Sequence, residues 1–68
     1  MSELMKAAGL ADVDPRLLEE AFRRAQAALR GRNVDPQALL AAIFAEARAG
    51  TRHMYGLVSA AQRSVTLH

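Results

Sequence analysis

Cysteine and tryptophan are absent from this sequence of 68 residues, and proline occurs only twice. Without cysteine, the chain has neither a disulfide nor a zinc site built on thiolates. The two histidines, His53 and His68, are too few and too far apart in the sequence for a metal cluster. We therefore expect no bound metal and no cofactor.

Long apolar runs are also missing. No stretch approaches the ~20 apolar residues that a membrane-spanning helix needs. The first ten residues, MSELMKAAGL, contain the acidic Glu3 and lack the apolar centre of a secretory signal. Together with the absence of cysteine, these features predict a cytoplasmic protein.

Known catalytic motifs do not occur in the sequence. There is no G-x-x-x-x-G-K, no G-x-G-x-x-G, no H-E-x-x-H and no nucleophile elbow. Glu19 and Glu20 are adjacent, and adjacent residues on a helix do not face each other. Ser59 and Ser64 have no nearby base in the sequence, and so small a chain has little room for a concave pocket. We therefore expect neither an enzyme nor a small-molecule substrate.

The residues that are present favour helices. Hydrophobic residues make up 51 % of the chain, and fifteen of them are alanine. Alanine has the highest helix propensity and buries little apolar area. The β-branched residues never form a strand-like alternating run. The sequence predicts an all-α protein.

Two similar segments mark helix starts. Val13-Asp14-Pro15 and Val34-Asp35-Pro36 each place an aspartate cap before a proline at the first helical position, after a valine that can pack as a staple. Gly9, Gly31 and Gly50 are natural helix ends. We predict one domain, 1–68, with helices over 1–12, 14–31, 35–49 and 51–65.

The last two predicted helices share one apolar phase. Leu40, Met54 and Ala61 are separated by multiples of seven residues, and the pattern passes through Gly50 without slipping. One continuous helix from 36 to about 64 is the alternative to a break or kink at Gly50, which we expect. The predicted fold is a small antiparallel helical hairpin or bundle of three to four helices. Its predicted core consists of Leu18, Phe22, Leu29, Leu40, Ile43, Phe44, Met54, Leu57 and Val58.

The apolar face of the last two predicted helices suggests a function. A chain this short buries only about 60 % of its unfolded surface, so self-association or a partner is the expected reinforcement. We predict a non-enzymatic protein-interaction module: an adaptor, antagonist, regulator or assembly factor that presents a helical face and forms oligomers. The predicted partner-binding residues are Met54, Leu57, Val58, Ala61 and Val65.

The charge is unevenly distributed. Residues 1–22 carry a net charge of −3, and residues 23–68 carry +5. Acids at helix starts and bases at helix ends complement helix dipoles, which explains much of this pattern. The basic segment also makes a small nucleic-acid-binding regulator the alternative function, although Tyr55 is the only aromatic left outside the predicted core for base stacking.

Thr51-Arg52-His53 goes against its predicted local structure. A helix start favours anions, yet the two residues after the predicted Thr51 cap are cationic. This arrangement predicts a contact for a phosphate or carboxylate of a partner, or for nucleic acid. The predicted contact residues are Thr51, Arg52, His53, Arg48 and Tyr55. The alternative is an ordinary surface cap with solvated cations.

One resemblance concerns the segment from Leu18 to Val65. With its Asp-Pro-x-x-Leu-Leu-Ala-Ala turn and helix, from Asp35 to Ala42, it resembles the helical hairpins of type III secretion needle subunits and their small co-chaperones. The likeness covers about two thirds of the chain. It implies a helical hairpin that is a component, or a co-chaperone, of a helical secretion assembly.

Overall fold

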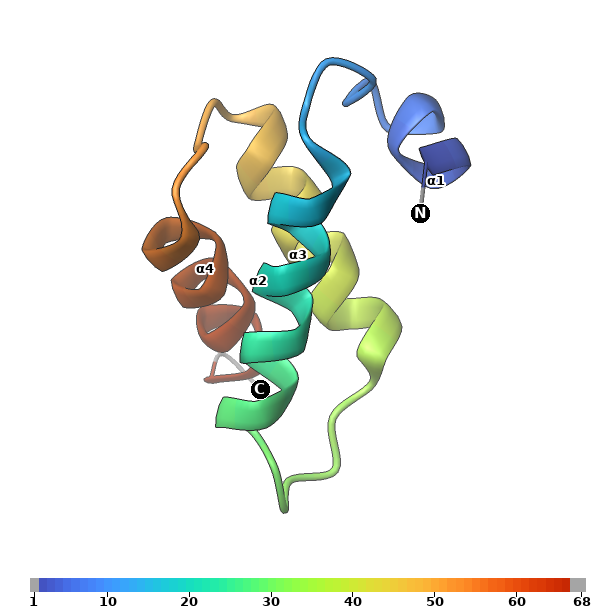
Figure 1. Cartoon of the computed structure of the whole chain (residues 1–68). Helices are drawn as coiled ribbons and strands as arrows, with labels where there is room; N and C mark the ends of the chain where they lie inside the picture. The colour runs from blue at the N-terminus through green and yellow to red at the C-terminus, as the bar shows by residue number, and fades with distance from the viewer. Residues whose placement is uncertain (1, 67–68) are drawn as a thin grey trace.

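The computed structural model describes residues 2–66 of the chain, so Met1, Leu67 and His68 lie outside the described part. Four helices follow one another: α1 (Ser2–Ala7), α2 (Pro15–Ala28), α3 (Pro36–Arg48) and α4 (Met54–Thr66). The described residues contain no strand, and the helices pack against each other as a small bundle (Figure 1). The predicted all-α class is confirmed.

The two longest loops end at Asp-Pro helix starts. The Asp14 carboxylate accepts the backbone N–H of Arg16 at 3.0 Å, and Asp35 accepts that of Gln37 at 3.0 Å. Pro15 and Pro36 occupy the first positions of α2 and α3, where a missing N–H costs no helical hydrogen bond. The start of each helix is therefore set by local chemistry.

The chain breaks at Gly50, between α3 and α4. Gly50 has a φ of +114°, a conformation that L side chains rarely adopt. Its N–H donates to the Ala47 carbonyl at 3.0 Å, and the N–H of Thr51 donates to the Glu46 carbonyl at 3.2 Å. These two bonds form a Schellman motif, which satisfies carbonyls at the end of α3 and turns the chain away from it.

Because of this break, α4 folds back along the bundle. Each of α2, α3 and α4 packs on the other two, and Figure 1 shows α4 running antiparallel to α3 and in the same direction as α2. The ends of α2 and α4 therefore lie at the same end of the molecule. The Cα trace measures 33 × 19 × 19 Å.

A single hydrophobic cluster fills the space between the helices. Of the predicted core, five residues are buried: Leu18, Leu29, Ile43, Phe44 and Leu57. The other four pack against the cluster and are only partly buried: Phe22, Leu40, Met54 and Val58. Four alanines of these helices, Ala21, Ala25, Ala47 and Ala61, have no exposed surface, like the larger Leu18, Ile43 and Leu57.

The N-terminal segment covers one end of this cluster. Met5, Leu10 and Val13 are buried in it, whereas Leu4 remains 56 % exposed. Helix α1 ends at Ala7, so the predicted helix over 1–12 is shorter than expected. Every helix among residues 2–66 is too short or too polar to cross a membrane.

Candidate functional site

The segment between α3 and α4 holds the cationic residues that the sequence analysis singled out. The Arg52 guanidinium turns back to the end of α3, where its Nη1 donates to the carbonyl of Ala47 and, at 3.1 Å, to that of Thr51. A cation at a helix C-terminus is favourable, because the last carbonyls carry partial negative charge. Arg52 therefore belongs to the end of α3 rather than to the start of α4.

His53 provides the cap of α4. Helix α4 begins at Met54, and the imidazole Nδ1 of His53 accepts the backbone N–H of Gly56 at 3.1 Å. Nδ1 carries no proton in this bond, because a protonated ring nitrogen cannot accept. The prediction that Thr51 caps a helix over 51–65 is therefore wrong: the helix starts three residues later, and an imidazole replaces the expected hydroxyl.

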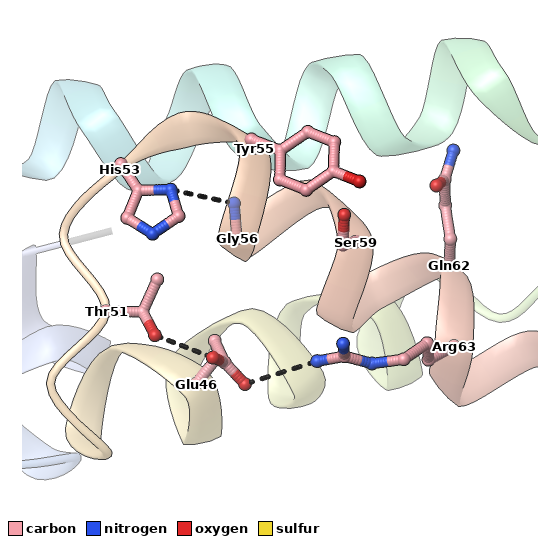
Figure 2. A pocket seen from close by; sticks show the side chains of 8 residues that line it. All are labelled: Glu46, Thr51, His53, Tyr55, Gly56, Ser59, Gln62 and Arg63. Carbon is pink, nitrogen blue, oxygen red and sulfur yellow. Dashed lines mark hydrogen bonds and ion pairs between the residues drawn. The ribbon is translucent and has the colours of Figure 1, made fainter.

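The Thr51 hydroxyl is instead bound to a carboxylate. It donates to Glu46 Oε2 at 2.6 Å, and Arg63 Nη2 of α4 lies 3.6 Å from Glu46 Oε1 (Figure 2). Glu46 thus connects α3, the loop and α4. Its negative charge occupies the position where an anionic ligand of Thr51 would bind.

An open depression lies beside Glu46, Thr51 and Arg63, along the outer side of α4. It has a volume of about 540 Å³ and is lined by Glu46, Thr51, His53, Tyr55, Gly56, Ser59, Gln62 and Arg63. Ser59 and His53 both line it, although they are six residues apart in the sequence. No hydrogen bond joins Ser59 to His53, or His53 to Glu46, within residues 2–66. These side chains therefore do not form the bonded nucleophile and base that covalent catalysis uses.

The structure divides the five residues of the predicted anion contact. Thr51, His53 and Tyr55 line one depression, while Arg52 is bound to backbone carbonyls and Arg48 does not line that depression. Of the five, Thr51, His53 and Tyr55 therefore share one surface, and the Arg52 guanidinium is held by the carbonyls of Ala47 and Thr51. Residues 2–66 contain no group of three or more side chains suited to a metal ion.

The predicted partner-binding residues of α4 also need correction. Leu57 and Ala61 have no exposed surface, because the break at Gly50 folds α4 onto α2 and α3. Met54 and Val58 pack partly buried against the same core, and Val65 lines a surface depression. The chain itself therefore covers most of the apolar face that was predicted to bind a partner.

A different apolar surface is exposed on α3. Leu39, Ile43 and Ala47 face the core, so the opposite side of the helix faces outward. The exposed residues on that side, which we call the α3 outer face, are Gln37, Ala38, Ala41, Ala45 and Arg48. Its middle is a ridge of three alanines, between polar residues at its two ends.

Two apolar depressions lie on either side of this ridge and share Ala41. The first, the Val65 depression, has a volume of about 550 Å³ and is lined by Asn33, Val34, Asp35, Ala38, Ala41, Ala42, Ser64 and Val65. The second, the Leu4 depression, has a volume of about 280 Å³ and is lined by Leu4, Gln37, Leu40, Ala41 and Phe44. Each depression joins residues of α3 to a segment that is distant in the sequence: Ser64 and Val65 in the first, and Leu4 in the second.

Sequence reasoning missed this surface because its two flanks are tertiary. The i, i+3, i+7 spacing of Ala38, Ala41 and Ala45 was available as a signal, but alanine is so frequent in this chain that the spacing alone selects no face. Val65 and Leu4 reach α3 only through the fold. No family model, curated protein or solved structure matches the chain, so the resemblance to secretion needle subunits receives no support.

Proposed function

We propose that this chain is a non-enzymatic protein-interaction module that binds a helix on the α3 outer face. The observation that carries the proposal is the pair of apolar depressions that meet at Ala41. A partner helix placed on the alanine ridge would lie close to the backbone of α3. Its larger apolar side chains would then enter the two depressions, as in helix-in-groove recognition.

The charge distribution on α3 supports this choice of surface. From Pro36 to Ala45 the helix has no charged side chain, and Asp35 and Arg48 stand at its two ends. The buried centre of a protein interface is typically depleted of charge, and its rim is polar. The α3 outer face has this arrangement.

Nucleic-acid binding is less well supported by the geometry. Of the seven arginines in residues 23–68, Arg23 and Arg24 pair with Glu20, Arg63 pairs with Glu46, and Arg52 is bound to carbonyls. A phosphate backbone needs several cations that can approach it together. If nucleic acid were nevertheless the ligand, affinity would fall steeply with salt, whereas apolar helix packing would not show that dependence.

A substitution at the centre of the surface tests the proposal. Ala41 is exposed, so Ala41→Arg should leave the fold intact while placing a charged side chain on the ridge. Ala27→Arg is the matched control, because Ala27 is an exposed alanine on α2. In affinity capture from an extract of cells that make the protein, the wild type and Ala27→Arg should retain the same polypeptides, and Ala41→Arg should lose them. Equal capture by all three would contradict the proposal.

A further inference from the structure

We propose that the helix bound on the α3 outer face is α3 of a second copy of this chain, packed antiparallel about a two-fold axis near Ala41 and Ala42. The inference rests on the proposed function and names the partner. It is carried by charge complementarity between the two ends of one helix, together with the apolar surface between them.

Each end of α3 carries one charge that forms no ion pair within residues 2–66: Asp35, the N-cap just before the α3 outer face, and Arg48, within that face. At the start of α3, Asp35 is exposed, and its Oδ1 accepts the Gln37 N–H at 3.0 Å. At the end of the helix, Arg48 is exposed and forms no ion pair with any described residue. One end is therefore negative and the other positive, on a helix of 13 residues.

An antiparallel pair of such helices satisfies both charges twice. In the register that places Ala41 against Ala42 of the second copy, Ala38 lies opposite Ala45, and Arg48 lies opposite Asp35. The two-fold axis repeats each contact, as in any isologous interface. A parallel pair would instead bring Arg48 next to Arg48 and Asp35 next to Asp35, which is repulsive.

The same symmetry covers the exposed apolar residues. A two-fold axis perpendicular to an antiparallel helix pair brings like flanks together, so the Leu4 depressions of the two copies meet on one side. Leu4, which is 56 % exposed in the single chain, would then pack against its own counterpart. The Val65 depressions meet on the other side. Burial of this surface would reinforce a chain whose size allows only a small core.

Disulfide trapping tests the register, since the natural sequence lacks cysteine and any introduced thiol is unique. The variants Ala38→Cys and Ala45→Cys are purified separately, one with an affinity tag, then mixed and oxidised. We expect the mixed 38–45 cross-link to form at least 10-fold faster than the 38–38 or 45–45 cross-link, because a disulfide requires Cα atoms within about 7 Å. Ala27→Cys, on α2, is the control and should cross-link slowly.

The solution mass tests the interface itself. By sedimentation equilibrium the wild type should be a dimer, and Ala41→Arg a monomer with an unchanged circular dichroism spectrum. Arg48→Glu should weaken the dimer about 10-fold, because each ion pair becomes a like-charge contact. Adding Asp35→Asn, which keeps an equivalent helix cap, should restore part of that loss by removing the repulsion.

The outcomes separate this inference from the proposed function. If the wild type stays monomeric up to about 1 mM, the partner is not a second copy. The same conclusion follows if Ala41→Arg has the same dimeric mass as the wild type. If Ala41→Arg still loses the captured polypeptides in that case, the proposed function stands with a different helix. Preferential 38–38 and 45–45 cross-links would also overturn the antiparallel arrangement.

Discussion

The imidazole of His53 lies directly over Gly56, and its Nδ1 accepts the Gly56 N–H at 3.1 Å. The two residues depend on each other for space as well as for the hydrogen bond. A Cβ at position 56 would come within 2.7 Å of His53 Cε1 and within 2.6 Å of Thr51 Cγ2. The start of α4 thus depends on the His53 side chain as its cap and on the absence of a side chain at Gly56.

Removing the cap should weaken the whole domain. We expect His53→Ala to lower the free energy of unfolding by about 1 kcal/mol, the usual value of an N-cap, which corresponds to about 4–8 °C in Tm for a domain of this size. His53→Asn should retain most of the stability, because asparagine is a good N-cap. Thermal unfolding of the three proteins checks this. Equal losses for both variants would show that the ring itself, and not its acceptor, stabilises the loop.

Replacing Gly56 by alanine tests the close approach. In an open helical position this change should stabilise the protein by about 1 kcal/mol through helix propensity. Here we expect no gain and a net loss, because the new methyl group displaces Thr51 and His53. In a Thr51→Ser background, which keeps the hydroxyl but lacks Cγ2, Gly56→Ala should be less harmful, and a double-mutant cycle from urea unfolding measures the difference. A cycle with no coupling would argue against the contact.

Two aromatic residues provide a contrast between core and surface. Phe44 is 9 % exposed, and Phe44→Ala should cost about 3–5 kcal/mol, enough to unfold a domain this small at ordinary temperature. Tyr55 is 81 % exposed, and Tyr55→Ala should change stability by less than about 0.5 kcal/mol. Circular dichroism at 25 °C distinguishes the two variants. A folded Phe44→Ala protein would show that Phe44 is not essential to the core.

Glu20 offers a test of surface electrostatics. Its hydrogen bond from Arg24 Nε at 3.0 Å, assisted by the charge of Arg23, holds the pKa of the Glu20 carboxyl below its usual range. Since the charged form is favoured in the folded state, this contribution to stability is present above the ordinary glutamate pKa and is lost as the pH falls through the lowered value. The effect on stability should be small, because the pair is exposed to solvent.

An NMR titration of the Glu20 carboxyl carbon measures that pKa. In Arg24→Gln we expect the pKa to rise toward the ordinary glutamate value, because the hydrogen bond is its largest cause. Arg23→Gln removes the more exposed ion pair, with its hydrogen bond to Glu20 Oε1 at 2.9 Å, and should raise the pKa less. The opposite order would assign the main effect to Arg23.

Much of the local structure follows from the sequence alone. The Asp-Pro starts at 14–15 and 35–36 and the glycine at 50 act within one helical turn, through a side-chain acceptor, a fixed φ or a positive φ. Such effects do not need the rest of the molecule. The all-α class and the buried positions Leu18, Ile43, Phe44 and Leu57 follow from composition and helical spacing in the same way.

The direction of α4, and with it the candidate site, was decided by tertiary structure. An apolar phase that continues through Gly50 is compatible with one long helix and with two helices that fold back, because both place the same residues on one side. Only packing on α2 and α3 buries Leu57 and Ala61, and leaves the outer side of α3 between Leu4 and Val65 as the open apolar surface. Likewise, the sequence determined that Arg52 and His53 follow Gly50 and Thr51, and the three-dimensional turn decided that the guanidinium binds the end of α3 and the imidazole caps α4.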